Sequence, residues 1–179
     1  MDASTLRETQ APLKQRYRDD AASARTPLHA AAEFADPGVT ATVRGWAGPV
    51  RAGLHPATGG DGSDACSGDM LLEALLACAG VTLRSVATAM GVQIRAASLT
   101  AEGCFDARGT LGVDREVPVG VTDVVVRAEL DTDADDATLA RLATATERYC
   151  VVGQTLATSP RIDVVRRPVG RPAAATTIG

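Results

Sequence analysis

The chain has 179 residues, of which 45% are hydrophobic and 22% are charged. This length and composition are sufficient to bury the core of one compact domain, and they differ from those of disordered proteins. The formal net charge is −4, and basic residues cluster only near the C-terminus. Binding to a nucleic-acid backbone is therefore not expected.

The N-terminal segment, residues 1–8, contains two acidic residues and no apolar run. It does not have the basic and then apolar pattern of a secretory signal, so we expect a cytoplasmic protein. The longest apolar run, residues 70–83, is interrupted by Glu73. This run is shorter than the roughly 20 residues that span a bilayer, so we expect a buried helix and no membrane association.

The first 24 residues are predicted to form a peripheral helical arm. Thr5 and Glu8 have the spacing of a capping box, and Pro12 is expected to kink or restart the helix. The main domain is expected over residues 25–167. The Arg- and Pro-rich tail, residues 168–179, is expected to be disordered.

Alternating apolar residues on both sides of an Asp-Pro-Gly sequence predict a β-hairpin near the start of the domain. The two strands cover residues 28–34 and 39–43, and the turn lies at residues 36–38. A short third strand is expected over residues 50–54. A long glycine-rich loop, residues 55–65, follows it.

A long central helix is predicted from Gly68 to Met90. Ser67 is the expected N-cap, the Asp69 carboxylate complements the helix dipole, and Gly91 is the expected stop. Apolar residues cover nearly every face of this segment. A helix with that pattern is typically buried.

β-branched residues are frequent in residues 92–105 and 121–130, which predicts a long hairpin. A second helix is expected to end just before Cys150, followed by a short helix over residues 151–157 and a strand over residues 162–165. This order of elements predicts an α+β domain in which antiparallel sheets surround a buried central helix, without parallel βαβ units.

The four cysteines are more easily explained as free, catalytic or metal-binding residues than as a disulfide framework in a reducing compartment. Cys78 lies in the most apolar segment, where a cysteine is often only a small buried hydrophobe. Cys150 lies at a helix junction, where amide dipoles and Arg148 are expected to lower a thiol pKa. Cys66 and Cys104 have no partner that the sequence indicates.

No metal site is expected, because no Cys-x-x-Cys or His-x-x-x-His spacing occurs in the chain. The acidic run at residues 131–136 lacks the glycine and the distal glutamate of a calcium loop. His55 is a candidate pocket residue on a loop that faces the helix of Cys78. The serine-hydrolase elbow and the phosphate-binding glycine loop are also absent.

The segment at residues 67–78 resembles the Pro-x-Glu-Leu-Leu-x-x-Ala-x-x-x-Cys stretch that opens the central helix of OsmC/Ohr proteins, with Cys78 in register. Residues 150–152, Cys-Val-Val, together with Leu156 are similar to the second motif of that family, Cys-Pro-Val with a following leucine. The resemblance extends over roughly residues 28–165.

This resemblance implies an α+β, OsmC-like fold in which two subunits intertwine as a homodimer, with central helices back to back and active sites at the interface. It implies that the Cys78 thiolate attacks an organic hydroperoxide and becomes a sulfenic acid, which Cys150 resolves as a disulfide. No cofactor is implied, only an external dithiol reductant of the lipoyl or thioredoxin type. The implied role is defence against oxidative or osmotic stress.

The chain departs from the family pattern at the group that activates the first cysteine. The peroxidases of the family use an arginine from the first hairpin turn, held by a glutamate near the start of the central helix. Here residues 36–38 of the turn contain no arginine, and Asp69 or Gly68 occupies the glutamate position. The candidate substitutes for the cation are Arg44, Arg51 and Arg148.

Three functions therefore remain open from the sequence. The leading hypothesis is a cysteine-based hydroperoxide reductase. The alternative is an OsmC-like dimer that binds a small molecule or senses redox state without efficient peroxidase turnover, and the missing turn arginine favours it. The third is a stress-associated structural homodimer in which Cys78 and Cys150 are merely buried.

Overall fold

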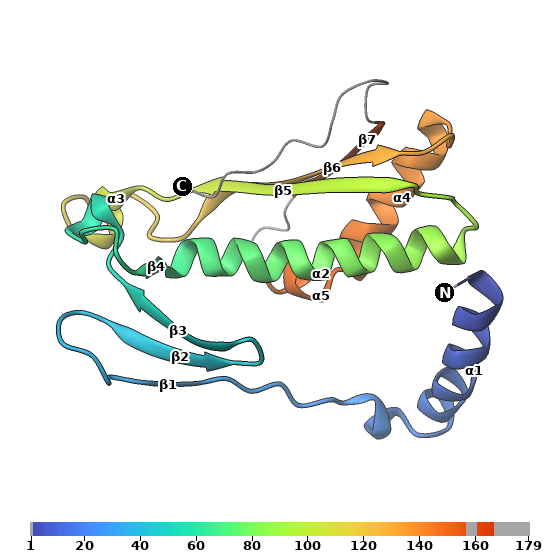
Figure 1. Cartoon of the computed structure of the whole chain (residues 1–179), viewed down its shortest axis with the longest axis horizontal. Coiled ribbons are helices and arrows are strands. Elements are labelled where there is room, and N and C mark those ends of the chain that lie inside the picture. Colours follow the sequence, from blue (N-terminus) through green and yellow to red (C-terminus); the bar gives the residue numbers. More distant parts are fainter. Residues whose placement is uncertain (1, 157–160, 167–179) are drawn as a thin grey trace.

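The computed structural model describes residues 2–156 and 161–166. Two β-sheets lie on opposite sides of a long central helix, α2 (Ser67–Ala89), as Figure 1 shows. The remaining helices are α1 (Ala3–Asp19), α3 (Ala107–Thr110), α4 (Asp136–Tyr149) and α5 (Val151–Thr155). This is the mixed α+β architecture that the order of elements predicts.

The first sheet has the strand order β1-β2-β3-β4 and the second has the order β5-β6-β7. The strands of the first sheet are β1 (Ala31–Glu33), β2 (Ala41–Gly45), β3 (Gly48–Gly53) and β4 (Ala65–Cys66). Those of the second sheet are β5 (Ala96–Cys104), β6 (Thr122–Asp131) and β7 (Arg161–Arg166). Two 3-10 turns, at Ala21–Ala24 and Pro56–Thr58, complete the described elements.

The predicted first hairpin is confirmed, because β1 pairs antiparallel with β2 and places Glu33 opposite Thr42. A side-chain hydrogen bond connects the Asp-Pro-Gly turn to β2: the Thr42 hydroxyl donates to Asp36 Oδ2 at 2.7 Å. β3 corresponds to the predicted third strand and continues the antiparallel pairing. The long hairpin of β5 and β6 is also confirmed.

The central helix is confirmed within one residue at each end. Leu75, Ala79 and Leu83 form its buried stripe together with Ala87. The predicted N-cap was wrong: Cys66 occupies that position, and its side chain makes no capping hydrogen bond. The helix stops as predicted, since Gly91 adopts the left-handed backbone conformation (φ 72°) that a residue with a side chain disfavours.

Two apolar clusters follow one another along α2 and form the protein core. The first contains six buried residues from α2, β6 and α4, namely Leu83, Ala87, Ala128, Leu130, Leu139 and Leu142. The second contains five buried residues from α2, β6, β7 and the junction of α4 with α5, namely Leu75, Ala79, Val126, Cys150 and Ile162. β6 therefore contributes to both clusters.

The prediction that parallel βαβ units are absent was wrong. β6 and β7 are parallel, with Val126 opposite Ile162, and α4 and α5 form the connection between them. Parallel neighbours require a crossover of a dozen or more residues, and the two consecutive helices supply it. A short parallel pair also joins β3 and β4.

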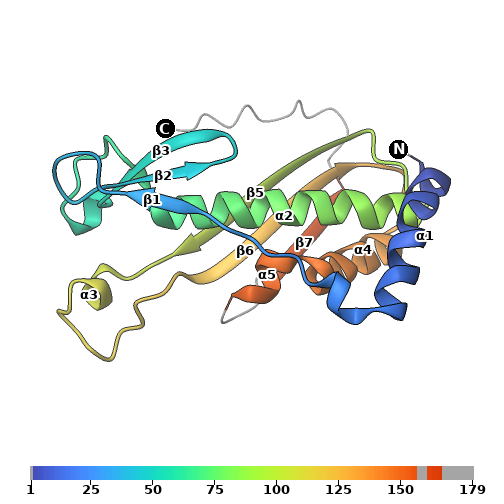
Figure 2. The same cartoon turned by 90° about the horizontal axis from the view of Figure 1, so that it is seen from below.

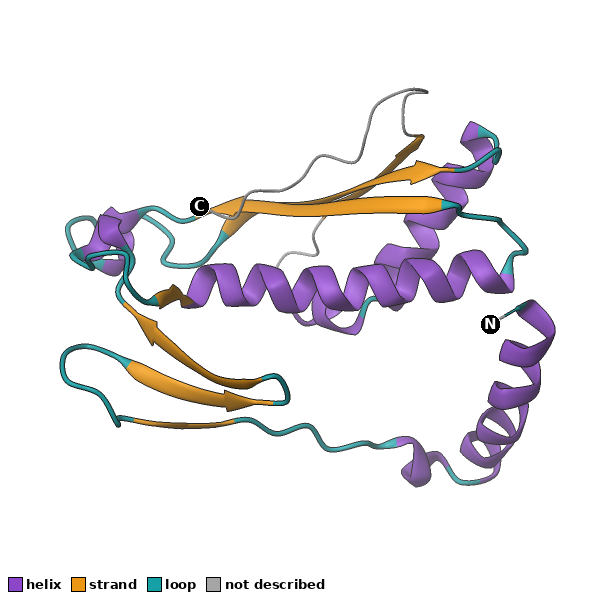
Figure 3. Cartoon of the chain, in the orientation of Figure 1, coloured by secondary structure: helices purple, strands orange, loops and turns teal. Residues whose placement is uncertain are grey.

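The N-terminal arm is helical, as predicted, but its details differ. Asp2 is the N-cap, and its Oδ1 accepts a hydrogen bond from the Thr5 amide at 2.8 Å, so the expected capping box at Thr5 was wrong. α1 continues through Pro12 as one helix. It lies near the end of α2 and is joined to β1 by an extended segment (Figure 3). The tail prediction for residues 168–179 falls outside the described residues.

By length and composition alone, α2 could cross a membrane, and among the described helices only α2 has this property. Core helices of other proteins pass the same test. In this structure α2 contributes four buried residues to the two clusters described above. One face of α2 is therefore buried, whereas positions such as Val81 are exposed in this chain, so the burial that the apolar run predicts is confirmed for one face only.

The fully buried side chain of Leu130, near the C-terminal end of β6, provides a test of this core. The substitution Leu130→Ala is expected to lower the free energy of unfolding by about 2–5 kcal/mol, because the cavity left in the first cluster cannot close completely. Urea denaturation measures the change. Leu111→Ala is the control, because Leu111 is 56% exposed. If Leu130→Ala lowers the free energy of unfolding no more than Leu111→Ala does, the placement of Leu130 in the core is contradicted.

Candidate functional site

The structure brings Cys78 and Cys150 together. Cys78 lies on α2 and is half-buried, whereas Cys150 lies between α4 and α5 and is fully buried. Both side chains belong to the second apolar cluster. Figure 2 shows α5 beside the middle of α2, which is where Cys78 is located. All four cysteines are free thiols in this structure.

Cys150 is held at a break between two helices. Its extended backbone (φ −72°, ψ 103°) ends α4 and starts α5. The Cys150 amide donates to the Thr146 carbonyl at 2.9 Å, and its Sγ accepts from the Gly153 amide at 3.4 Å. Glu147 connects the junction to β7, because its Oε1 accepts a hydrogen bond from the Ile162 amide at 2.8 Å.

The surroundings of Cys78 favour its thiolate. Burial raises the pKa of Cys78, but the Val152 amide, the Cys150 thiol, the Val151 amide and the Thr82 hydroxyl together lower it below its ordinary value. The two amides belong to the first turn of α5, where backbone N–H groups have no partner within the helix. In the described part of one chain, these neutral groups therefore favour a negative charge on Cys78.

The surroundings of Cys150 have the opposite effect. Burial raises the pKa of the Cys150 thiol, the Gly153 amide partly offsets this, and the adjacent Cys78 raises it further. The sequence predicted a lowered pKa for Cys150, which was wrong because complete burial and a neighbouring thiolate outweigh the helix dipole. The pair is thus asymmetric: as the pH rises, Cys78 loses its proton before Cys150 does.

None of the three candidate arginines is among the strongest influences on the pKa of Cys78. Arg44 forms an ion pair with Glu33, and Arg51 forms one with Asp64. The guanidinium carbon of Arg148 lies 5.6 Å from the centre of the Tyr149 ring. In the part of one chain that the structure describes, the strongest influences on Cys78 are therefore its burial and neutral groups.

His55 and Asp69 lie together but apart from the thiol pair. With Cys66 and Cys104 they line a cavity of about 230 Å³ at the start of α2. Some ten residues of helix, about 15 Å, separate this end of α2 from Cys78. Among the described residues, no group of three or more His, Cys, Asp or Glu side chains is arranged to hold a metal ion.

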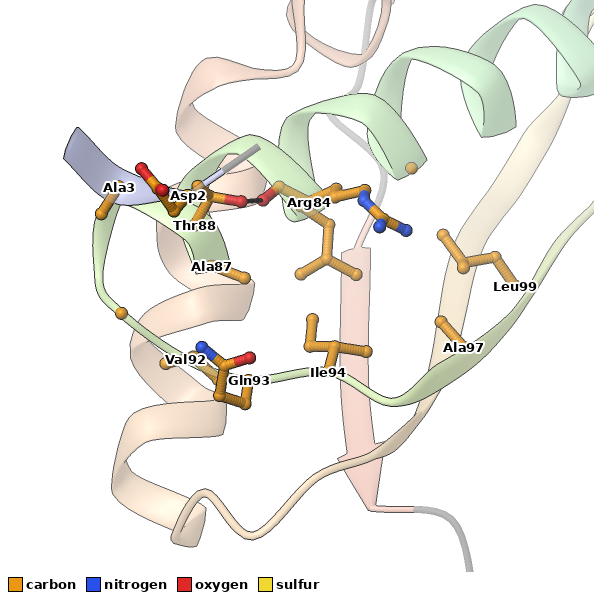
Figure 4. A pocket seen from close by; sticks show the side chains of 13 residues that line it. Asp2, Ala3, Arg84, Ala87, Thr88, Val92, Gln93, Ile94, Ala97 and Leu99 are labelled. Atoms are coloured by element: carbon orange, nitrogen blue, oxygen red, sulfur yellow. Dashed lines mark hydrogen bonds between the residues drawn. The ribbon is translucent and has the colours of Figure 1, made fainter. Parts of the chain in front are cut away.

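A second cavity, of about 290 Å³, lies at the opposite end of α2 (Figure 4). Its walls contain both apolar and polar side chains and come from α2, the segment that leads into β5, and β5 itself, with Leu83, Ile94 and Leu99 among the apolar ones. Arg84 and the first residues of α1 lie at its border. Neither Cys78 nor Cys150 lines this cavity.

The sequence interpretation missed the neutral groups around Cys78. Thr82 follows Cys78 by one helical turn, a spacing that is visible in the sequence and that places two side chains next to each other. The positions of the Val151 and Val152 amides cannot be inferred from the residue types, because every residue except proline has a backbone amide. Only the packing of α5 on α2 shows that these amides face the sulfur.

The OsmC-like protein family matches residues 60–165 of this chain, and both Cys78 and Cys150 lie within the match. The chain therefore belongs to the OsmC-like family. No curated protein sequence matches it.

Solved structures show the same fold. The OsmC-like protein of Mycoplasma pneumoniae is 15% identical with a TM-score of 0.63, over 79% of this chain and 96% of that one. An organic hydroperoxide resistance protein of Elizabethkingia anophelis is 14% identical with a TM-score of 0.63, over 80% and 100%. The organic hydroperoxide resistance protein OsmC of Legionella pneumophila is 15% identical with a TM-score of 0.59, over 81% and 99%. The predicted OsmC-like fold is thus confirmed.

The asymmetry of the thiol pair predicts how the two cysteines respond to pH. Because the pKa of Cys78 is lowered and that of Cys150 is raised, alkylation of Cys78 by iodoacetamide is expected to increase at a lower pH than that of Cys150. Mass spectrometry of the two peptides across a pH series measures both midpoints, with N-acetylcysteine as the reference. A midpoint for Cys78 at or above that of Cys150 would contradict the assignment.

Proposed function

We propose that this protein is a cytoplasmic, thiol-dependent peroxidase that reduces organic hydroperoxides in defence against oxidative or osmotic stress. The observation that supports this most directly is the packing of Cys78, with its lowered pKa, against Cys150, with its raised pKa. Relatives of the same fold from two bacteria are named organic hydroperoxide resistance proteins, which supports the substrate class.

In the proposed reaction the Cys78 thiolate attacks one oxygen of the hydroperoxide, the O–O bond breaks, and Cys78 becomes a sulfenic acid. The leaving alkoxide takes the proton of the Cys150 thiol and departs as an alcohol. The Cys150 thiolate then attacks the sulfur of the sulfenic acid, which forms a disulfide and releases hydroxide.

An external dithiol of the lipoyl or thioredoxin type completes the cycle. Its two thiols reduce the Cys78–Cys150 disulfide and are themselves oxidised to a disulfide. The electrons therefore pass from the dithiol to the hydroperoxide through the two cysteines, and the proposed cycle involves no bound cofactor.

The neighbours of the thiol pair favour an apolar substrate. Leu76, Val152 and Leu156 contact the same cluster as the two sulfurs. Apolar side chains beside a reacting thiol favour a substrate that carries an apolar group, because its burial removes apolar surface from water. An alkyl or aryl hydroperoxide fits this environment better than hydrogen peroxide does.

We further propose that the protein forms a homodimer. In one subunit, Val81 on the outer face of α2 is 72% exposed, and Phe34 and Trp46 beside the first sheet are 90% and 104% exposed. Exposed apolar surface of this kind supports the proposed interface. A second subunit packed against the outer face of α2 would cover it and lie beside Cys78, as the family resemblance implies.

A second candidate function is a redox-sensing or small-molecule-binding dimer without efficient peroxidase turnover. The observation that favours it is that Arg44 and Arg51 form ion pairs with carboxylates. No described arginine is among the strongest influences on the pKa of Cys78. Such a protein would form the disulfide once per molecule and then bind or signal without further reduction.

Peroxide consumption driven by a dithiol separates these functions. The wild-type protein is expected to turn over cumene hydroperoxide, and Cys78→Ser is expected to reduce the rate by at least about a hundredfold because the nucleophile is lost. Cys150→Ser is expected to stop repeated turnover. Cys104→Ser is the control, because Cys104 is exposed and lies away from the pair.

The outcomes of this assay are distinct. Equal rates in the wild type and in Cys78→Ser and Cys150→Ser would contradict the peroxidase proposal. One equivalent of peroxide consumed without further turnover would favour the second candidate. No reaction at all would favour a structural dimer with two buried thiols.

The proposed dimer predicts a difference between two exposed valines. Val81 on α2 is 72% exposed and Val113 in the loop after α3 is 73% exposed. Val81→Arg is expected to shift the protein toward monomer, because two such charges would meet across the pair of central helices. Val113→Arg is expected to leave the protein dimeric. Light scattering after gel filtration measures both, and an intact Val81→Arg dimer would overturn the proposed interface.

A further inference from the structure

The cavity of about 290 Å³ at the end of α2 is a site separate from the thiol pair (Figure 4). Neither Cys78 nor Cys150 lines it, and Val81, which marks the proposed dimer face, does not line it either. Its apolar side chains come from the last turns of α2, the segment that follows and β5. They are Leu83, Ala87, Val92, Ile94, Ala97 and Leu99. A cavity of this volume is near the lower end of the range of small-molecule sites, so it suits a small ligand.

Four polar side chains border the apolar walls of this cavity, namely Asp2, Arg84, Thr88 and Gln93. The Thr88 hydroxyl has a partner in its own helix, because it donates to the Arg84 carbonyl at 2.8 Å. The Arg84 guanidinium forms no ion pair within the described residues. Figure 4 shows this guanidinium on the side of the cavity where Leu99 lies. A positive charge and apolar surface therefore meet at one cavity.

Arg84 differs from two other arginines that line cavities of this protein. Arg51 lines a cavity beside the first sheet and pairs with Asp64, and Arg108 lines one beside α3 and pairs with Asp106. The chain itself supplies the carboxylate in both of those cases. In the part of the chain that the structure describes, it supplies none to Arg84. The guanidinium of Arg84 is therefore available to the anionic group of a ligand.

The charges around the cavity favour a ligand with a single negative charge. Asp2 accepts hydrogen bonds from the Thr5 amide and the Ser4 hydroxyl, which lower the pKa of its carboxyl group to about 2. Asp2 is therefore negatively charged at neutral pH and would repel a dianionic phosphate more than a carboxylate. A carboxylate also matches the parallel N–H donors of a guanidinium. The apolar walls favour a ligand whose remainder is hydrocarbon.

We propose that this cavity binds a small amphipathic monocarboxylate, whose carboxylate pairs with Arg84 and whose hydrocarbon tail lies against Leu83, Ile94 and Leu99. The site goes beyond the proposed peroxidase function, because binding there involves neither thiol. Asp2 and Ala3, the first described residues of the N-terminal arm, border the cavity, and the arm lies outside residues 60–165, which match the OsmC-like family. The arm thus contributes to a ligand site of this chain.

The test uses octanoate as the probe and 1-octanol as the neutral probe with the same chain length, both measured by isothermal titration calorimetry. The wild-type protein is expected to bind one octanoate per chain and to bind 1-octanol more weakly. Arg84→Gln is expected to weaken octanoate binding by at least about fivefold, the effect of losing one hydrogen bond, and to leave 1-octanol binding unchanged.

Two further variants serve as controls for charge and for location. Arg115→Gln removes an exposed arginine that does not line this cavity, so it is expected to bind octanoate as the wild type does. Ala97→Phe fills the cavity from an exposed position of β5 and is expected to weaken the binding of both probes. Thermal unfolding of each variant verifies that the fold is intact.

Several outcomes would overturn the inference. They are the absence of saturable octanoate binding, equal affinities of the wild type for the two probes, wild-type octanoate affinity in Arg84→Gln or in Ala97→Phe, and an equal loss in Arg115→Gln. Cys78→Ser is expected to bind octanoate as the wild type does. The ligand site and the peroxidase function can therefore fail separately.

Discussion

The packing of α2 against the junction of α4 and α5 is the contact on which the candidate site depends. Cys150 is buried because this junction is pressed onto α2 beside Cys78. The junction is held there because β7 pairs parallel to β6, so the chain must cross over through α4 and α5 before it returns to the sheet. The Glu147 carboxylate, which accepts from the β7 amide of Ile162, ties the crossover to the strand.

That one contact also explains why the two thiols differ. The break at Cys150 directs the first amides of α5 toward Cys78, and the same break encloses Cys150 on all sides. Burial therefore keeps a proton on Cys150, while the amides and the Thr82 hydroxyl favour loss of the proton from Cys78. In the proposed reaction, a pair with this asymmetry would supply both the nucleophile and the proton donor. This is the combination that hydroperoxide reduction requires.

The sequence predicted α2 and its cysteine because the apolar pattern and the family motif coincide there. It did not predict the direction of β7, since a short strand such as residues 161–166 fits a parallel or an antiparallel partner equally well. The partners of Arg44 and Arg51 also depend on tertiary structure, because Glu33 and Asp64 are brought beside them only when the first sheet forms. The effect of Thr82 on the pKa of Cys78 was not predicted, although the spacing of the two residues on the helix is visible in the sequence.

The central claim is that Cys78 and Cys150 form one redox pair, and mapping the disulfide tests it most directly. The reduced protein is treated with one equivalent of cumene hydroperoxide, digested without reduction and analysed by mass spectrometry. We predict a peptide pair joined through Cys78 and Cys150 that is two hydrogen atoms lighter than the separate thiols. A protein that instead accumulates sulfinic acid on Cys78, or that forms its disulfide between Cys66 and Cys104, would contradict the account.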